Sequence, residues 1–479
     1  MTGAEPYTMG ALHQDSRQVS QDDVFIAVRG IHADGHLFIE DAIGQGASVI
    51  ICEESYYTEA SDICVIEVES TRNILGHLAQ AFQGNPSEKL TIIGVTGTNG
   101  KTTISTLVWQ ALHKLGAKPS LLGTVAKHIN NEVFDSRLTT ADPIELAADM
   151  KAMADAGSTH LIMEISSHAL DQQRVNGFRV HVGAFTNLSH DHLDYHSDME
   201  SYASAKRRLF DGLDENGWAI INTDDPYGDF MAENASCKVL DFSFHGKGTV
   251  NCEIISSTSD GLKIKVDDVI LETPLVGEFN AYNTVQALLI CSALGYDTTK
   301  VAKILSECKG APGRMERVQL ADNANTPLVL VDYAHTPDAL KNVAQTLQGL
   351  KKEDENLIII FGCGGDRDKS KRPAMAKIAE EYGDSVVVTS DNPRTEDPEA
   401  IIKDITEGFT SEGGWISITD RKTAIEKTIL KSSASDIILI AGKGHETYQE
   451  VHGFRSHFDD REIAEIALGM RAQKAKGEN

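Results

Sequence analysis

The chain has 479 residues, 41% of them hydrophobic, and its 71 acidic and 44 basic residues give a formal net charge of −27. This apolar content excludes a largely disordered chain, and the acidic balance argues against a protein that binds nucleic acid. At roughly 150 residues per domain, the length favours about three domains. Anionic small ligands are not excluded, because backbone dipoles can hold a phosphate inside an acidic protein.

The sequence also bears on the cellular compartment. It contains no apolar stretch long enough to cross a membrane, and residues 1–10 lack the basic flank and apolar run of a secretion signal. The seven cysteines are scattered without CxxC or CxxH spacing. This is typical of reduced, mostly buried thiols and argues against a zinc site. We therefore expect a cytoplasmic protein.

Residues 1–87 form the first of three blocks. Short strand-like runs lie at 24–28, 47–52 and 63–68, with Gly and Asp between them. The block ends at Gly84-Asn85-Pro86-Ser87, which has the composition of a linker. We expect a small N-terminal α/β domain here.

The second block, residues 88–315, alternates short apolar runs with helical patterns. The predicted strands are 90–95, 161–165, 182–185 and 218–221, and the predicted helices include 143–156 and 202–210. Such alternation indicates a mainly parallel sheet covered by helices. A charged, alternating stretch near 250–272 predicts a small antiparallel excursion.

The third block, residues 316–479, repeats the alternation. The predicted strands are 328–331, 357–361, 385–389 and 436–440, and amphipathic helices are predicted at 338–350, 372–382 and 421–432. This pattern predicts a second doubly wound, Rossmann-like domain. The whole chain is thus expected to be an α/β protein of three domains.

A glycine-rich loop follows the first strand of the second block. Gly97-Thr98-Asn99-Gly100 leads into Lys101-Thr102-Thr103 at the start of a helix. Glycines let the backbone approach a polyphosphate, Lys101 would bridge the β and γ phosphates, and the Thr102 hydroxyl would sit at Mg²⁺. The spacing departs from GxxxxGK[ST], because Val95 stands six residues before Lys101. An ordinary glycine-rich turn explains neither the Lys-Thr pair nor the strand before it, so nucleotide binding is favoured.

Metal-ligand residue types follow two further strands. Glu164 ends one strand, and His192 follows another in a polar, histidine-rich loop. Residues at the carboxyl ends of neighbouring parallel strands face one crevice, where Mg²⁺ would find oxygen ligands. A solvated polar loop explains either motif taken alone, and the phosphate loop on the same sheet favours the metal. Lys206, in isolation, is expected to be a surface lysine on an amphipathic helix.

Together these motifs resemble the Mur ligases of bacterial cell-wall synthesis. The loop TGTNGKTT, the Glu164 strand, the segment 191–196 (DHLDYH) and the Tyr-x-x-Ala-Lys motif ending at Lys206 occur in the family's order and approximate spacing. The resemblance covers essentially the whole chain, and the unusual loop spacing is the family's own form. It implies an ATP-dependent ligase that extends a UDP-N-acetylmuramoyl peptide, with Mg²⁺ as cofactor.

The resemblance also implies residue roles. Lys206 would be carbamylated by CO₂ and help to hold a second Mg²⁺. The implied metal contacts are Thr102, Glu164, His192 and carbamylated Lys206, and the implied catalytic residues are Lys101, Lys206, His192 and Glu164. The implied ATP contacts beyond loop residues 97–103 are Asn280, Asn283, Arg314, Asp332 and His335. The implied UDP-sugar-peptide contacts are Ser16, His32, Thr139, Thr140, Ser166, Gln172 and Arg174; the family often has His at position 173, where this chain has Gln.

Three loops of the third block fall just after predicted strands and suit a zwitterionic ligand. They are 362–368, 391–394 and 442–446. Arg offers a bidentate fork to a carboxylate, and Glu accepts from an ammonium group. In the family, Asp-Asn-Pro-Arg resembles the form that selects meso-diaminopimelate over L-lysine, whose lack of a second carboxylate would leave Arg394 unpaired. The implied amino-acid contacts are Arg367, Asp391, Asn392, Pro393, Arg394, Gly442 and Glu446.

The expected function is therefore ligation of meso-diaminopimelate to UDP-N-acetylmuramoyl-L-alanyl-D-glutamate through an acyl phosphate. Three alternatives stay open: the L-lysine-adding form of the ligase, a folylpolyglutamate synthetase-like ligase, and a non-enzymatic nucleotide-binding regulator. A surface cap of a turn is the alternative role for Arg394. The expected partners are the small-molecule substrates alone, with no nucleic acid and no membrane, and the chain is expected to be a monomer.

Overall fold

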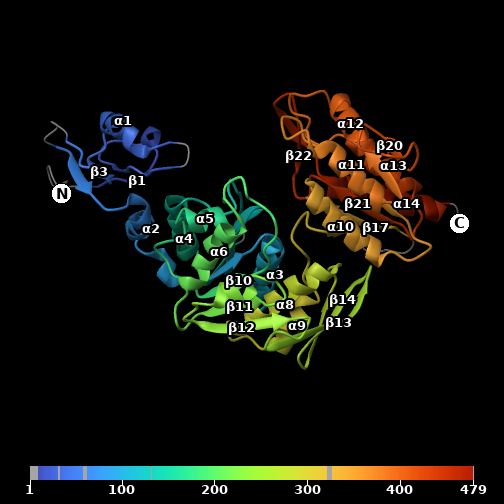
Figure 1. The fold of residues 1–479 in the computed structure, drawn as a ribbon, viewed down its shortest axis with the longest axis horizontal. Helices are drawn as coiled ribbons and strands as arrows, with labels where there is room; N and C mark the ends of the chain where they lie inside the picture. The colour runs from blue at the N-terminus through green and yellow to red at the C-terminus, as the bar shows by residue number, and fades with distance from the viewer. Residues whose placement is uncertain (1–8, 31–32, 58–61, 131, 321–325, 478–479) are drawn as a thin grey trace. The chain divides into compact units, whose positions relative to one another are not determined.

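The computed structural model describes residues 9–30, 33–57, 62–130, 132–320 and 326–477. The chain packs as two compact units, residues 1–252 with 285–301 and residues 253–284 with 302–479. Sheets of mainly parallel strands carry helices on their faces, so the predicted mixed α/β fold is confirmed (Figure 1). The domain boundaries predicted at 87/88 and 315/316 stay predictions.

The N-terminal part of the first unit is a small parallel sheet. Its strand order is β1 (Leu12–His13), β2 (Val24–Ile26), β3 (Val49–Cys52) and β4 (Cys64–Glu67). Helices α1 (Ile39–Gln45) and α2 (Thr71–Phe82) accompany it, and Ser70 caps α2 by accepting from the Asn73 amide. The expected linker is instead the start of a short 3₁₀ helix, η3 (Pro86–Lys89), in which Pro86 and Ser87 are buried.

The central sheet of the first unit places the loops that follow β5, β9 and β10 at one edge. From β12 onward its strands, in spatial order, are β12 (Lys238–Ser243), β11 (Trp218–Asn222), β10 (Val182–Phe185), β5 (Thr91–Thr96), β9 (His160–Glu164), β6 (Pro119–Leu122), β7 (Ala126–Ile129) and β8 (Glu132–Asp135). On its other side, β12 pairs in parallel with residues 250–251. The first six run parallel, and β7 and β8 are antiparallel. Val95 pairs with Glu164 and Thr96 with Phe185, so β5, β9 and β10 end at the same level.

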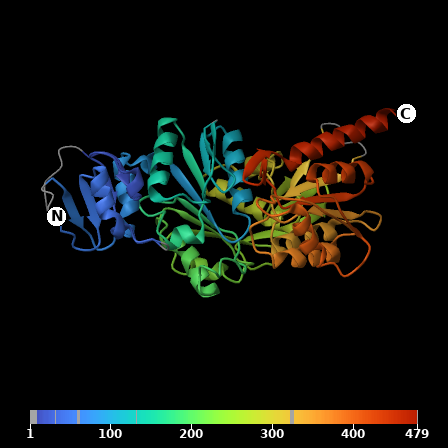
Figure 2. The same cartoon turned by 90° about the horizontal axis from the view of Figure 1, so that it is seen from above.

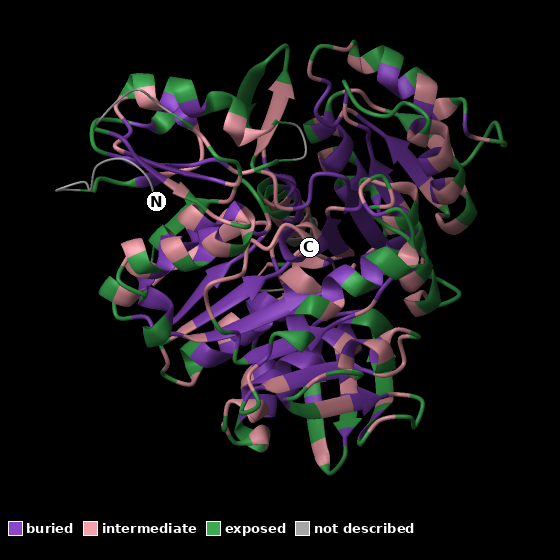
Figure 3. Cartoon of the chain, turned by 60° about the vertical axis from the view of Figure 1, so that its left-hand side comes forward, coloured by how far each residue is buried: buried purple, intermediate pink, exposed green. Residues whose placement is uncertain are grey.

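Helices cover this central sheet because their apolar positions recur at helical spacing. They are α3 (Lys101–Lys114), α4 (Pro143–Asp155), α5 (Ser167–Asp171), α6 (Met199–Asp211) and α7 (Gly228–Ala232). Leu146, Met150 and Met153 of α4 pack into the core below β9, and Tyr202 and Phe210 of α6 join the same core. In Figure 3 the strands are buried along most of their length.

The second unit begins with the predicted antiparallel excursion. Strand β13 (Val250–Thr258) leads into β14 (Gly261–Val266), which pairs antiparallel with β15 (Val269–Thr273), so this prediction is confirmed. Two helices follow, α8 (Glu278–Ala293) and α9 (Thr298–Leu305). Residues 285–293 of α8 and 298–301 of α9 belong to the first unit, as do residues 250–252 of β13.

A doubly wound sheet forms the rest of the second unit. The spatial order is β16 (Glu316–Val318), β17 (Leu328–Asp332), β21 (Ile437–Ala441), β18 (Leu357–Phe361), β19 (Ser385–Val388) and β20 (Trp415–Ser417), and only β16 is antiparallel. One face packs against α10 (Pro337–Leu350), α11 (Lys371–Tyr382) and α12 (Pro398–Thr406). The other packs against α13 (Arg421–Lys431) and α14 (Asp460–Gly477), the long red helix of Figure 2.

The last feature of this unit is a hairpin between β22 (Tyr448–Val451) and β23 (Phe454–His457). Across both units, all seven cysteines are buried free thiols, as the sequence predicted. No helix in the described ranges combines the length and apolarity that a membrane span requires.

Candidate active site

The phosphate-loop sequence forms a tight turn between β5 and α3. Gly97 and Gly100 have φ values of +148° and +88°, which favour glycine. A Cβ added at Gly97 would lie 1.8 Å from Thr186 Oγ1, so a larger residue does not fit. The Thr98 amide donates to the Asn187 carbonyl at 2.8 Å, and the Asn99 amide donates to Asn187 Oδ1 at 3.0 Å. The loop after β10 therefore braces the phosphate loop.

Lys101 folds back over this loop. Its Nζ donates to the carbonyl oxygens of Gly97 at 2.9 Å and Thr98 at 2.8 Å. The ammonium group thus lies at the turn, at the start of α3, where the helix dipole also favours an anion. This arrangement suits a bound polyphosphate.

Glu164 and Thr102 meet, as the metal hypothesis requires. Glu164 is buried at the end of β9, and its Oε2 accepts from Thr102 Oγ1 at 3.0 Å. Thr124, which no sequence signal singled out, donates its amide to Oε1 at 2.9 Å and its hydroxyl to Oε2 at 3.1 Å. A Cβ on Gly123 would lie 2.5 Å from Oε1, so a bare backbone is needed beside the carboxylate.

Lys206 is not the surface lysine expected from its helix pattern. It is 1% exposed, its Nζ donates to the Gly97 carbonyl at 2.9 Å, and it lies 4.6 Å from the ring centre of Tyr202. Burial, and then the charge of Lys101, hold the pKa of Lys206 well below its usual value. This shift favours the uncharged form of the amine.

His192 lies near Tyr202 and has a left-handed backbone conformation, with φ of +55°. Its ring centre is 4.9 Å from that of His168 and 6.1 Å from that of Tyr202. Burial lowers the pKa of His192, and the Asp191 carboxylate, 3.7 Å from Nε2, opposes the shift. The imidazole is therefore biased toward the neutral form that binds metals.

The donors that meet here are oxygen atoms, the kind that Mg²⁺ prefers. Among the described residues, no group of three His, Cys, Asp or Glu side chains is placed to hold a metal ion. Thr102 and Glu164 instead bring a hydroxyl and a carboxylate together. Mg²⁺ prefers such oxygen ligands and keeps several waters.

The predicted substrate-peptide residues form one network around the end of β9. Thr140 Oγ1 donates to the Glu164 carbonyl at 2.9 Å and accepts from the Ser166 amide at 3.1 Å. Arg174 donates Nη1 to the Thr140 carbonyl at 2.8 Å and Nε to Gln172 Oε1 at 3.0 Å. The Thr139 hydroxyl lies 3.0 Å from that of Thr124.

The remaining residues predicted to contact the UDP-sugar lie in the N-terminal part of the chain. Ser16 is buried at the start of the short helix η1 (Ser16–Gln18), between β1 and β2. His32 lies outside the described residues.

In the second unit, the predicted nucleotide residues fall into two groups. Asn280 and Asn283 are buried on α8, and Asn283 Nδ2 donates to Asn280 Oδ1 at 3.0 Å. Around Tyr333, the Arg314 guanidinium stacks on the ring at 4.7 Å, and the His335 ring centre lies 4.6 Å away.

Asp332 anchors this second group. Its carboxylate accepts from the amides of Met315 at 2.7 Å and Ala334 at 2.8 Å. Burial raises the pKa of Asp332, and the Arg314 charge opposes that shift.

The three loops expected to bind the amino acid converge. The Gly365 amide donates to the Asn392 carbonyl at 2.9 Å, and Arg394 Nη1 donates to the Gly365 carbonyl at 2.7 Å. Asn392 Nδ2 donates to Glu446 Oε2 at 2.8 Å. Gly442 has φ of +116°, and a Cβ there would lie 2.7 Å from Asp391 Oδ2.

Within this cluster the predicted residues differ in exposure. Pro393 is buried and Arg394 is half-buried, whereas Arg367 is exposed. Two wholly buried cations that the sequence analysis did not assign also belong to the cluster, Lys443 and Arg421. The sequence could have singled out Lys443, because this lysine stands between two glycines directly after a buried strand. Arg421 begins an amphipathic helix and has no local signature of burial.

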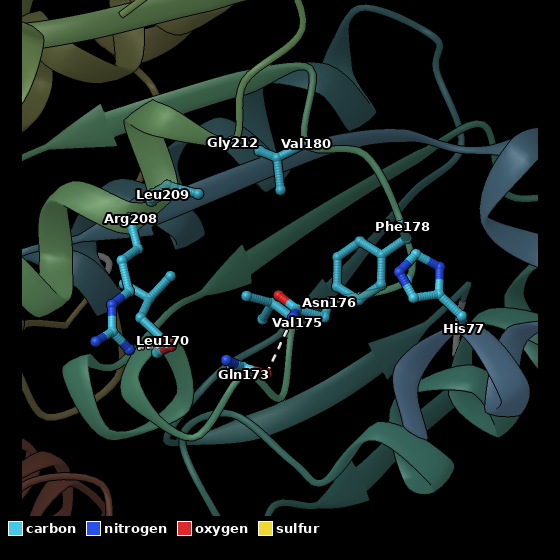
Figure 4. A pocket seen from close by; sticks show the side chains of 11 residues that line it. His77, Leu170, Gln173, Val175, Asn176, Phe178, Val180, Arg208, Leu209 and Gly212 are labelled. Carbon is cyan, nitrogen blue, oxygen red and sulfur yellow. Dashed lines mark hydrogen bonds between the residues drawn. The ribbon is translucent and has the colours of Figure 1, made fainter. Parts of the chain in front are cut away.

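A separate cavity of about 430 Å³ opens in the first unit (Figure 4). Leu170, Val175, Phe178 and Leu209 give it apolar walls, and His77 of α2 lies beside Phe178. None of the residues predicted to contact a substrate lines it.

Fold and site together define a multidomain α/β protein of the phosphate-loop class, with a second unit that carries a polar, arginine-bearing loop cluster. Comparison with known proteins narrows the class. Family models match in three consecutive stretches: the Mur ligase family catalytic domain at residues 10–83, the Mur ligase middle domain at 95–291, and the Mur ligase glutamate ligase domain at 313–444. The chain belongs to the Mur ligase family.

Individual relatives are similar over nearly the full length. A protein of Cytophaga hutchinsonii named UDP-N-acetylmuramoyl-L-alanyl-D-glutamate--2,6-diaminopimelate ligase is 43% identical over 478 residues, covering 98% of this chain and 96% of its own. A protein of Phocaeicola vulgatus with the same name is 39% identical, covering 95% and 94%. A solved structure of a ligase with that name has 35% identity and a TM-score of 0.74, covering 97% of this chain and 95% of its own.

Proposed function

We propose that the chain is an ATP-dependent ligase that adds meso-2,6-diaminopimelate to UDP-N-acetylmuramoyl-L-alanyl-D-glutamate. Family membership and two relatives with this named activity support the proposal. The observation that carries the choice of amino acid is the hydrogen-bonded convergence of the loops bearing Arg394 and Glu446. We assign the UDP-sugar to residues 1–87, ATP to 88–315 and the amino acid to 316–479.

Nucleotide binding would use the phosphate loop. The amides of the 97–103 turn and Lys101 would hold the polyphosphate, whose oxygens would replace the Gly97 and Thr98 carbonyls as partners of the ammonium group. Asn280 and Asn283 are proposed on the adenine side, and Arg314, Asp332 and His335 on the ribose and phosphate side.

Thr102, Glu164, His192 and Lys206 would hold Mg²⁺. When bound, the ion neutralises phosphate charge during transfer. We propose that Lys206 is carbamylated: its neutral amine forms an N–C bond to CO₂ and loses a proton to solvent. This turns a buried group whose cationic form is disfavoured into an oxygen ligand.

The reaction would proceed in two substitutions. The D-glutamate side-chain carboxylate attacks the γ-phosphorus of ATP, and ADP leaves with the acyl phosphate remaining. The amine of meso-diaminopimelate then attacks the acyl carbon, and the tetrahedral intermediate collapses to amide and phosphate. The protein acts mainly by positioning and charge neutralisation. Ser166, Gln172, Arg174 and the Thr139-Thr140 pair would hold the sugar-peptide.

Selectivity would come from Arg394. Its backbone is fixed in a left-handed conformation, because its amide donates to the Glu450 carbonyl at 3.0 Å and its carbonyl accepts from His452 at 2.6 Å. The guanidinium would pair with the distal carboxylate of meso-diaminopimelate, and Arg367 would assist. L-lysine lacks that carboxylate, and an unpaired half-buried charge opposes its binding.

The test is release of ADP by purified protein supplied with UDP-N-acetylmuramoyl-dipeptide and either amino acid. We expect turnover with meso-diaminopimelate and at least about thirtyfold loss of kcat/KM in Arg394→Ala, equivalent to about 2 kcal/mol. Arg179→Ala, at an exposed arginine paired with Asp214, is the control. Equal or better turnover of L-lysine would overturn the selectivity. ATP binding without amino-acid-dependent ADP release would point to a nucleotide-binding regulator.

A further inference from the structure

We propose that Lys443 is a positioning residue of the amino-acid site, which aims the Glu446 carboxylate at the ammonium group of the bound amino acid. The inference rests on the proposed function, because it concerns the group that would receive that ammonium. Lys443 would not itself touch the substrate. It would act through Glu446 and Asn392, which belong to two different loops.

Lys443 closes a buried triangle of hydrogen bonds. Its side chain is wholly buried, and Nζ donates to Glu446 Oε2 at 2.9 Å and to Asn392 Oδ1 at 3.1 Å. Asn392 Nδ2 donates to the same Glu446 Oε2 at 2.8 Å. The loop after β19 and the loop after β21 are thereby tied together through one ammonium group.

The triangle uses only one oxygen of the Glu446 carboxylate. Within the described ranges, no hydrogen bond or ion pair engages Oε1, and the side chain is 17% exposed. Two donors on Oε2 therefore fix the plane of the carboxylate and leave Oε1 to accept from a ligand. A donor with an ammonium group matches that single anionic acceptor.

Asn392 is immobilised by the same contacts. Its Oδ1 also accepts from the Glu450 amide at 2.9 Å, and its carbonyl accepts from the Gly365 amide at 2.9 Å. Asn392 immediately precedes Pro393 and Arg394, so the position of Asn392 fixes the position of the Arg394 backbone. Lys443 therefore bears on both groups at the distal end of the ligand, on the distal ammonium through Glu446 and on the distal carboxylate through the arginine loop.

Charge explains why a lysine occupies this position. Glu446 and Asp391 are two carboxylates in one largely buried cluster, and an unpaired buried carboxylate is costly. Lys443 supplies a compensating charge while its ammonium group contacts Glu446 only through Oε2. A neutral residue of similar length would fill the space but would release the Glu446 side chain.

The test compares two ligands in calorimetric titration, meso-diaminopimelate and L-2-aminopimelate, which lacks the distal amino group. Lys443→Met should weaken meso-diaminopimelate at least about tenfold and bring the ratio of the two dissociation constants close to one. A purely structural role would weaken both ligands alike and leave the ratio unchanged, and that result would overturn the inference. The KM for ATP should stay unchanged.

Two controls keep the outcomes distinct. Lys422→Met alters an exposed lysine of α13 and should leave both constants as in the unaltered protein. Lys443→Gln keeps a hydrogen-bond donor and serves if the methionine variant does not fold; it should also reduce the ratio. If the unaltered protein fails to bind meso-diaminopimelate, the proposed function is wrong. If it binds and both Lys443 variants keep its ligand ratio, the positioning role is wrong.

Discussion

The ion pair between Arg421 and Asp460 gives a prediction about stability that can be worked in numbers. Neither side chain is exposed, and the pair is bidentate, with Nε–Oδ1 at 2.8 Å and Nη2–Oδ2 at 2.7 Å. Arg421 Nη2 also donates to the Ala441 carbonyl at 3.0 Å, directly before Gly442. The pair joins α13, α14 and the end of β21.

Arg421→Met removes one partner and leaves Asp460 as an uncompensated buried charge. Breaking a buried pair in this way costs about 3–5 kcal/mol. The second unit has about 200 residues, and for that size each kcal/mol shifts the melting temperature by about 2–4 °C. The variant should therefore melt about 6–20 °C lower in that unit.

A double variant separates the cost of the orphaned charge from the value of the pair. Arg421→Met with Asp460→Leu replaces both ions by apolar side chains of similar size, which is often neutral or stabilising. Scanning calorimetry should show most of the lost melting temperature restored. Lys422→Met, one residue along the same helix, should melt as the unaltered protein does. If the double variant is no more stable than Arg421→Met, burial of an unpaired carboxylate is not the cause of the loss.

Three further outcomes follow from individual contacts. Glu164→Gln removes the anionic oxygen but keeps a hydrogen-bonding side chain. The kcat/KM should therefore fall by about 10²-fold or more, with little change in melting temperature. A fully active variant would show that Glu164 is not part of the metal site. Burial lowers the pKa of His445 from 6.5 to about 4. The neutral form therefore stabilises the fold above pH 6.5, and that contribution, as much as about 3 kcal/mol, is lost as the pH falls through 4. The difference in melting temperature between the protein and His445→Phe should shrink over this pH range, and a pH-independent difference would contradict the assignment. Gly97→Ala places a Cβ against Thr186 and should abolish the rise in melting temperature caused by ATP, whereas Gly349→Ala, with open space on α10, should keep it.

The eight strands predicted for the two large sheets lie within two residues of their predicted bounds, whereas β6, β7, β8, β12, β16 and β20 were not predicted. Runs such as 182–185 and 357–361 are short, apolar and bounded by turn residues, and both were placed correctly. Because 90–95 and 161–165 were expected to be parallel strands of one sheet, Glu164 and the phosphate loop were expected at one sheet edge, as the register of β5 and β9 confirms. Local pattern sufficed because burial on both faces leaves a continuous apolar run.

What the pattern could not supply were contacts across long sequence separations. Thr124 reaches Glu164 from 40 residues upstream, and nothing in its own neighbourhood marks it. Lys206 follows the polar period of an amphipathic helix, yet the phosphate loop covers it, so local reasoning gave the wrong exposure. The segment at 84–87 has the composition of a linker, but the Ser87 amide donates to Gln80 Oε1 in a buried hydrogen bond, so the segment packs against α2.

Two lysines that share the Gly97 carbonyl, Lys101 and Lys206, have different proposed roles. Lys101 and Lys206 both donate to the Gly97 carbonyl at 2.9 Å, and the charge of Lys101 adds to burial in lowering the pKa of Lys206. Burial and the charge of Lys101 therefore favour the neutral form of Lys206, the form in which we propose that it takes up CO₂. The more exposed Lys101 stays available for phosphate. Once carbamylated, Lys206 would be an anion beside that cation, so the modification would replace repulsion by attraction and at the same time create an oxygen ligand.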